Sequence, residues 1–163
     1  MRRPLAEMAR IMAAEELELT VKDHAKQQKR RQQGRSMNVD QIKAEAEQMR
    51  EKQCWASATP KHLVQLHAML HAHVYGVVSG SGQGREFTFA SSSATKMLRE
   101  EFANDPEAMV DFLRWSWQRE QDREEWRRKN GRDGARLDWR RQFAQRSVLT
   151  DYRVEQARKK GAA

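Results

Sequence analysis

Four histidines in the segment HLVQLHAMLHAHVY have a type and a spacing that could hold a metal ion: His62, His67, His71 and His73. His67 and His71 are four residues apart and share one side of a helix, like the histidines of the zinc motif HExxH. Ala68 follows His67, so the glutamate that acts as general base in that motif is missing. At about 100° per residue, His62 and His73 fall on the other flank, and the four side chains cannot converge. We interpret them as the border of an apolar core face and predict no metal site.

Two other patterns could be mistaken for catalytic motifs. The loop SGSGQG, residues 79–84, is rich in glycine, but it lacks the Gly-Lys-Ser/Thr ending of a phosphate-binding loop, and no buried strand precedes it. We interpret it as a flexible connection. No serine, histidine and aspartate lie in a context that indicates a catalytic triad. The sequence therefore predicts that the protein is not an enzyme and needs no cofactor.

The segment RWSWQREQDREEWRRKNGRDGARLDWRRQF, residues 114–143, holds four of the five tryptophans beside many arginines. Two glycines interrupt its most basic part, which allows backbone amides and guanidinium groups to approach a phosphate backbone. We predict that phosphates are held by Arg127, Arg128, Lys129, Arg132, Arg136, Arg140 and Arg141.

The tryptophans of this segment have two interpretations. On a helix, Trp115, Arg119 and Trp126 form one stripe, in which the two indoles could stack on bases while neighbouring arginines hold phosphates. Alternatively, the stripe packs against the last helices of the chain, with Trp139 and Phe143 opposite it. A core with few aliphatic side chains depends on large aromatic ones for most of its buried apolar surface. Trp115 and Trp126 are the candidate stacking residues.

The charge of the chain favours a polyanionic partner. The formal net charge is +8 and the isoelectric point is about 10.0, and the excess lies at both ends of the chain. A second basic patch spans residues 22–35, where Lys26, Lys29, Arg30 and Arg31 could contact nucleic acid. We expect DNA rather than RNA as the ligand. Binding should be through the phosphate backbone, because no recognition helix for base-specific contacts is evident.

The hydrophobic residues are few and unevenly distributed. Leu, Ile, Val and Phe number 26, of which 18 lie in residues 59–152 and 7 in residues 1–58. We therefore predict an all-α protein with a basic helical arm over residues 1–58, which is flexible or docked on a partner. A compact helical core domain follows at residues 59–152, and a charged tail at 153–163.

Start and stop signals place the individual helices. Thr59-Pro60 and Asp105-Pro106 predict helices of residues 60–78 and 106–130. Residues 38–53 read as a helix with a narrow apolar stripe, which suits docking on a partner helix. EFTF, residues 86–89, alternates like a short strand and is expected to be extended, with a serine of 91–93 capping a helix to residue 103. A short helix at 137–144 and a last helix capped by Thr150 or Asp151 complete the chain.

Four stretches within residues 97–154 resemble one class of proteins: MLREEF, MVDFLRWSWQRE, REEWRRKNGR and LTDYRV. They look like parts of uncharacterised small proteins of tailed bacteriophages and prophages. The resemblance covers about the last two thirds of the chain. It implies a phage-related role in the bacterial cytosol, and it identifies no catalytic residue.

These observations lead to one main functional hypothesis. We expect a non-enzymatic accessory protein that binds nucleic acid in replication, recombination, packaging or transcription control. Cys54 is the only cysteine, no apolar run is long enough to span a membrane, and the N-terminus is not a secretory signal, so we expect a cytoplasmic protein. The alternative is a protein–protein interaction module for virion assembly or host takeover that docks through its N-terminal helices. A metal-dependent enzyme that uses His67 and His71 is the third.

Overall fold

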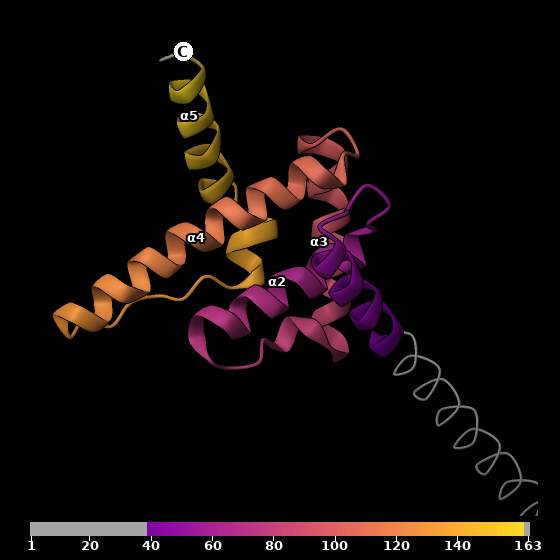
Figure 1. The fold of residues 1–163 in the computed structure, drawn as a ribbon, viewed down its shortest axis with the longest axis horizontal. Coiled ribbons are helices and arrows are strands. Elements are labelled where there is room, and N and C mark those ends of the chain that lie inside the picture. The colour runs from indigo at the N-terminus through magenta and orange to yellow at the C-terminus, as the bar shows by residue number, and fades with distance from the viewer. Residues whose placement is uncertain (1–38, 162–163) are drawn as a thin grey trace, which may run out of the picture. The chain divides into compact units, whose positions relative to one another are not determined.

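Helices form all the regular secondary structure in the part of the chain that the computed structural model describes, residues 39–161 (Figure 1). The all-α prediction is therefore confirmed. A first helix covers residues 39–52, and the others are α2 (Pro60–Tyr75), α3 (Gly84–Glu101), α4 (Pro106–Asn130) and α5 (Ser147–Gly161). A short 3₁₀ turn (Gly80–Gly82) precedes α3, and a π-helical turn (Arg140–Ala144) lies between α4 and α5. None of the described helices is long and apolar enough to cross a membrane.

The two proline signals predicted the starts of α2 and α4 correctly. The carboxylate of Asp105 accepts hydrogen bonds from the backbone N–H groups of Glu107 (3.0 Å) and Ala108 (3.2 Å), and Pro106 occupies the first helical position. Gly131 ends α4 in the left-handed conformation with φ 59°, as the sequence predicts. The first helix is tied to α2 by His62, whose Nε2 lies 2.9 Å from a carboxylate oxygen of Glu45.

The core lies where α2, α3 and α4 meet. The predicted apolar face of α4 is buried, and α3 contributes a stripe at helical spacing. Fully or nearly fully buried side chains include Leu63, Val64, Ala90, Ala94, Met97, Met109, Phe112, Leu113 and Trp117. Ile42 and Ala46 of the first helix and Trp55 after it are also buried, so part of the narrow stripe expected to meet a partner helix packs within this chain.

The prediction of an extended EFTF segment is wrong. Residues 86–89 belong to α3, because Phe87 is buried in helical register with Ala90 and Ala94, while Phe89 is half exposed. Four alternating residues are too few to separate a strand from a helix. The serines that follow are interior to the helix rather than a cap. Ser92 Oγ donates to the Thr88 carbonyl oxygen (3.1 Å), the return bond that lets serine fit within a helix.

Three other boundaries differ from expectation. Helix α2 ends at Tyr75 rather than residue 78, because Gly76 adopts φ 69° and its N–H bonds to the Ala72 carbonyl oxygen at 2.9 Å. The short helix expected at 137–144 is the π-helical turn, closed by a bond from Gln145 N to the Arg140 carbonyl oxygen (2.9 Å). Helix α5 begins at Ser147, before the expected caps, and runs on through most of the segment expected to be a tail.

Candidate nucleic-acid interface

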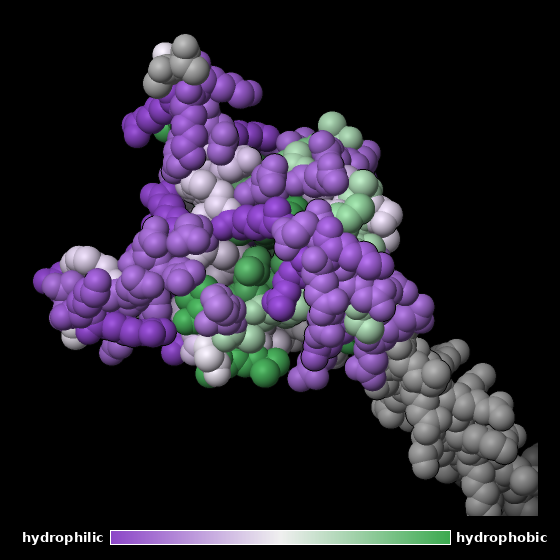
Figure 2. Space-filling view, in the orientation of Figure 1, coloured by the Kyte–Doolittle hydropathy of each residue, from purple (hydrophilic) through white to green (hydrophobic). Residues whose placement is uncertain are grey.

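The basic segment folds into a hairpin made of one helix and one extended stretch. The C-terminal half of α4 forms one leg, and residues 132–138 run back beside it without regular secondary structure (Figure 1). We call residues 123–141 the basic hairpin; they contain eight arginine or lysine residues and four acidic ones. Hydrophilic residues cover almost all of this part of the surface in the space-filling view (Figure 2).

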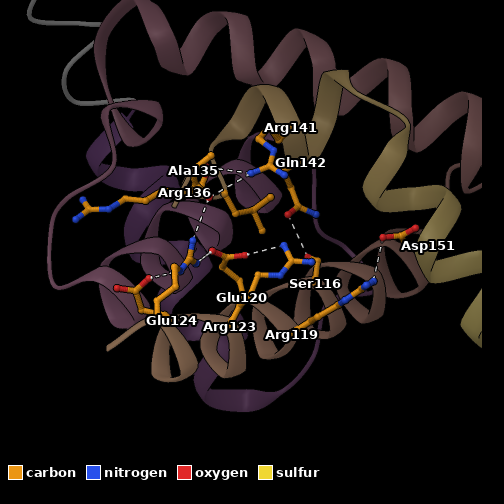
Figure 3. A network of polar contacts seen from close by, with 12 residues as sticks. Ser116, Arg119, Glu120, Arg123, Glu124, Ala135, Arg136, Arg141, Gln142 and Asp151 are labelled. Atoms are coloured by element: carbon orange, nitrogen blue, oxygen red, sulfur yellow. Dashed lines mark hydrogen bonds and ion pairs between the residues drawn. The ribbon is translucent and has the colours of Figure 1, made fainter. Parts of the chain in front are cut away.

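A buried carboxylate holds the two legs of the hairpin together. Glu120 is only 2% exposed, and its Oε1 accepts hydrogen bonds from the Tyr75 hydroxyl (2.8 Å) and from Nη2 of Arg127. Arg127 also bonds to the carbonyl oxygen of Ala135 in the returning leg (3.3 Å). The backbone N–H of Leu137 donates to the same Tyr75 hydroxyl at 2.7 Å. Figure 3 shows the part of this network that surrounds Glu120, with Arg123 and Glu124 of the same helix and Ala135 of the returning leg nearby.

The electrostatics of this network keep Arg127 inside it. Burial opposes the charge of Arg127, but the hydrogen bond and the negative charge of Glu120, with Glu124 at 3.1 Å from Nε, raise its pKa above the ordinary value. Burial likewise raises the pKa of the Tyr75 hydroxyl, so it remains a hydrogen-bond donor to Glu120. Breaking one partner of such a buried pair leaves an uncompensated charge and costs about 3–5 kcal/mol. Arg127 therefore organises the hairpin and is not exposed to a phosphate.

Two further features fix the returning leg. Gly134 approaches Arg127 so closely that a Cβ atom added to the glycine would lie 2.7 Å from Nη1, a distance that side-chain carbons do not tolerate. Leu137 is buried against Val74 and Trp117 and anchors the base of the leg in the core. The hairpin is thus held at its middle by a polar contact and at its base by an apolar one.

The remaining predicted cations divide into two groups. Arg128 and Arg140 are partly neutralised: Arg128 lies 3.8 Å from Glu124, and Arg140 lies 3.4 Å from Glu86 and 4.0 Å from Asp138. The other group makes no ion pair with any carboxylate in residues 39–161 and consists of Lys129, Arg132, Arg136 and Arg141.

Aromatic rings and carbonyl groups orient the three arginines of the second group. The Arg132 guanidinium carbon lies 5.6 Å from the Trp126 ring centre, and that of Arg136 lies 5.1 Å from the Tyr75 ring centre. Arg141 Nη1 is within 3.4 Å of two carbonyl oxygens of the returning leg. These contacts order the side chains without cancelling their charge, because a ring or a carbonyl group carries no net charge.

The two candidate stacking tryptophans have different surroundings. Trp115 is half-buried, with the Tyr152 ring of α5 at 5.2 Å and the Arg119 guanidinium at 5.3 Å. An ion pair between Arg119 and Asp151 (3.1 Å) reinforces the contact between α4 and α5. Trp126 is 51% exposed. The stripe therefore packs against the last helix at one end only, and through Tyr152 rather than Trp139 or Phe143.

The histidines lie outside the hairpin. His67 is fully buried between the rings of Trp117 (5.2 Å) and Phe143 (5.3 Å), and burial, with the charge of His71, lowers its pKa from 6.5 to about 3. Burial also lowers the pKa of His71, with a smaller contribution from the positive charge of Arg136. Within residues 39–161, no group of three or more histidine, cysteine, aspartate or glutamate side chains could hold a metal ion. The cations Lys26, Lys29, Arg30 and Arg31 lie outside the described residues.

Helical periodicity carries a signal for the burial of Glu120 and Arg127. Glu120 lies 11 residues after Met109 and Arg127 lies 18 residues after it, so both fall on the core face of α4. Acidic residues with arginine three or four positions away, as in this helix, are typical of surface ion pairs, but the side chain of Glu120 is buried. Tyr75 carried no comparable signal, because its partners are 45 and 62 residues away.

Comparisons with other proteins add nothing to this geometry: no family model matches the sequence, and no curated protein or solved structure is significantly similar to it.

Proposed function

We propose that this chain is a non-enzymatic accessory protein that binds the phosphate backbone of nucleic acid through the basic hairpin. The supporting observation is the set of four cations without a carboxylate partner on a hairpin whose backbone is fixed by a buried network. Ordered arginine side chains on a rigid element lose little conformational freedom when they meet a phosphate, which favours binding. Contacts of this kind position a ligand without reading its sequence.

The proposal also includes the process in which the protein acts, a second contact with the ligand and the type of nucleic acid. The resemblance of about residues 60–152 to small proteins of tailed bacteriophages supports a role in phage replication, recombination, packaging or transcription control, which would be carried out in the host cytoplasm. Lys26, Lys29, Arg30 and Arg31 would add a second backbone contact. DNA is the preferred ligand in this proposal, and RNA of the same length and sequence is the comparison.

The test removes three of the free charges together. In the triple variant Lys129→Ala, Arg132→Ala, Arg136→Ala, we expect weaker binding to a labelled oligonucleotide in fluorescence anisotropy. The dependence of log K on log salt concentration should also become shallower, by about 2 for a single strand and about 3 for a duplex, because each lost phosphate contact contributes about 0.7 or 0.9.

The matched control removes the same charge elsewhere. Lys43, Lys61 and Lys96 are exposed on the first helix, α2 and α3, and none forms an ion pair within residues 39–161. The variant Lys43→Ala, Lys61→Ala, Lys96→Ala has the same net charge as the hairpin variant and should keep its salt dependence close to that of the unsubstituted chain. Equal losses in the two triple variants would show that net charge alone attracts the oligonucleotide, and the hairpin would be excluded as the binding site.

A further inference from the structure

Trp126 is the one tryptophan of this chain with an open indole surface. All five tryptophans lie in the described part of the chain; Trp55, Trp117 and Trp139 are at most 8% exposed, and Trp115 is half-buried against α5. Trp126, in contrast, is 51% exposed near the end of α4. An indole that is left in water forgoes the stabilisation that burial would provide, so its position needs a reason other than the stability of the folded chain.

The surroundings of Trp126 are those of a stacking site. The Arg132 guanidinium carbon lies 5.6 Å from the ring centre, and Lys129 is one helical turn further along α4, on the same side. Both belong to the group without a carboxylate partner. The helix is also well formed at this point, since Asn130 Nδ2 donates to the Trp126 carbonyl oxygen at 2.7 Å. An aromatic face therefore stands on a fixed backbone beside two cations that could hold a phosphate.

Trp115 lacks these properties. The Tyr152 ring lies 5.2 Å from it and its surface is half-buried, and the arginine beside it, Arg119, is paired with Asp151. Although Trp115 and Trp126 lie on the same stripe of α4, only Trp126 has a surface that a planar ligand can reach. Trp115 is a structural contact with α5.

We infer that Trp126 stacks on an unpaired base, and that the ligand class of the basic hairpin is single-stranded nucleic acid. The bases of a duplex are stacked on one another and offer no face to an indole, whereas every base of a single strand has a free face. Lys129 and Arg132 then hold the phosphates next to the stacked base. Asp122, one turn before Trp126 on the same face of α4, carries a negative charge that directs the backbone away from itself and toward these two cations. This inference rests on the proposed nucleic-acid binding and adds the strandedness of the ligand to it.

The test compares three ligands with two variants of Trp126. The probes are a labelled 20-nucleotide thymidine strand, the same strand in which all bases are removed to leave abasic sites, and a 20-base-pair duplex. Stacking on one base contributes about 1–3 kcal/mol, so Trp126→Ala should weaken binding to the thymidine strand by about 5-fold to 150-fold. Trp126→Phe, which keeps an aromatic face, should restore most of that loss.

The other two ligands separate stacking from charge. The abasic strand keeps its phosphates, so its affinity should be low for the unsubstituted chain and unchanged by Trp126→Ala. Duplex affinity should also be insensitive to this substitution. Trp115→Phe is the matched aromatic control and should bind the thymidine strand as the unsubstituted chain does. Binding should also quench the tryptophan fluorescence of the unsubstituted chain and quench it less in Trp126→Phe.

Each outcome has a definite meaning. If the hairpin charge variant weakens binding but Trp126→Ala binds the thymidine strand normally, or if Trp126→Ala weakens strand and duplex equally, the stacking inference is overturned and the proposed function stands. If no probe binds, or the charge variant binds as the unsubstituted chain does, the proposed function is overturned, and single-strand binding at the hairpin with it. A polyuridine strand run in parallel determines whether RNA can replace DNA.

Discussion

The burial of His67 should make the folded protein measurably less stable in acid. The imidazole is fully buried between the rings of Trp117 and Phe143, and neither ring nitrogen has a hydrogen-bond partner in the described part of the chain. Burial, together with the nearby His71, lowers its pKa from 6.5 to about 3. The folded protein therefore holds this histidine neutral over a pH range in which the unfolded chain binds a proton.

The sign and size of the effect follow from proton linkage. Because the pKa is lower in the folded state, the unfolded state takes up the extra proton between pH 6.5 and pH 3, and stability falls as the pH falls through that range. Each pH unit corresponds to about 1.4 kcal/mol. The loss attributable to His67 should reach about 3 kcal/mol at pH 4.5 and about 4 kcal/mol at pH 3. Losses of that size are a large part of the roughly 5–15 kcal/mol stability of an ordinary domain.

The assay is urea unfolding, followed by circular dichroism at pH 7.5 and pH 4.5. His67→Leu replaces the imidazole with an apolar side chain that cannot titrate, and should lose about 3 kcal/mol less than the unsubstituted chain between the two pH values. The comparison of pH dependence remains valid even if leucine packs imperfectly, because a packing defect acts equally at both pH values. His73→Gln, at an exposed position of the same helix, is the matched control. Equal pH dependence in His67→Leu and the unsubstituted chain would refute the argument.

Three further substitutions test the elements that position the hairpin, each by urea unfolding against the unsubstituted chain. Gly134→Ala should cost about 1–3 kcal/mol, because its Cβ atom displaces Arg127; a neutral result would mean that the guanidinium moves aside freely. Tyr75→Phe should cost about 1–3 kcal/mol by leaving the backbone N–H of Leu137 without a partner and removing one of the donors to Glu120, and no change would mean that water replaces the hydroxyl. Asp105→Ala removes the cap of α4 and should cost about 1 kcal/mol, whereas Asp105→Asn should keep most of it.

Local signals in the sequence were sufficient for much of the fold. Asp105 and Gly131 mark the ends of α4 because a cap and a left-handed glycine act through bonds to residues a few positions away. The spacing of Met109, Leu113 and Trp117 predicted a buried face because helical periodicity extends over many residues. The prediction for residues 86–89 was wrong because their alternation is short, and the burial of Phe87 in helical register with Ala90 and Ala94 decided their conformation.

The sequence does not predict which arginines of the basic hairpin are buried and which are free of carboxylates. The hairpin's excess of arginine is visible in the sequence, but composition does not distinguish Arg127, which is buried, from Arg132, which is free of carboxylates. The distinction depends on Tyr75, a residue of another helix that supplies the hydroxyl bridging Glu120 and the returning leg. Contacts over such separations follow from the packing of α2 against α4, which no local pattern encodes.

The close approach of Gly134 to Arg127 also constrains how this protein can change over evolution. A larger residue at position 134 requires the side chain at position 127 to move or to be shortened, and shortening it deprives Glu120 of its buried counter-charge. Substitutions at the three positions are therefore expected to occur together or in a fixed order, with the carboxylate replaced first or at the same time. When homologous sequences are compared, a joint change at 120, 127 and 134 would mark a lineage that holds its hairpin by different chemistry.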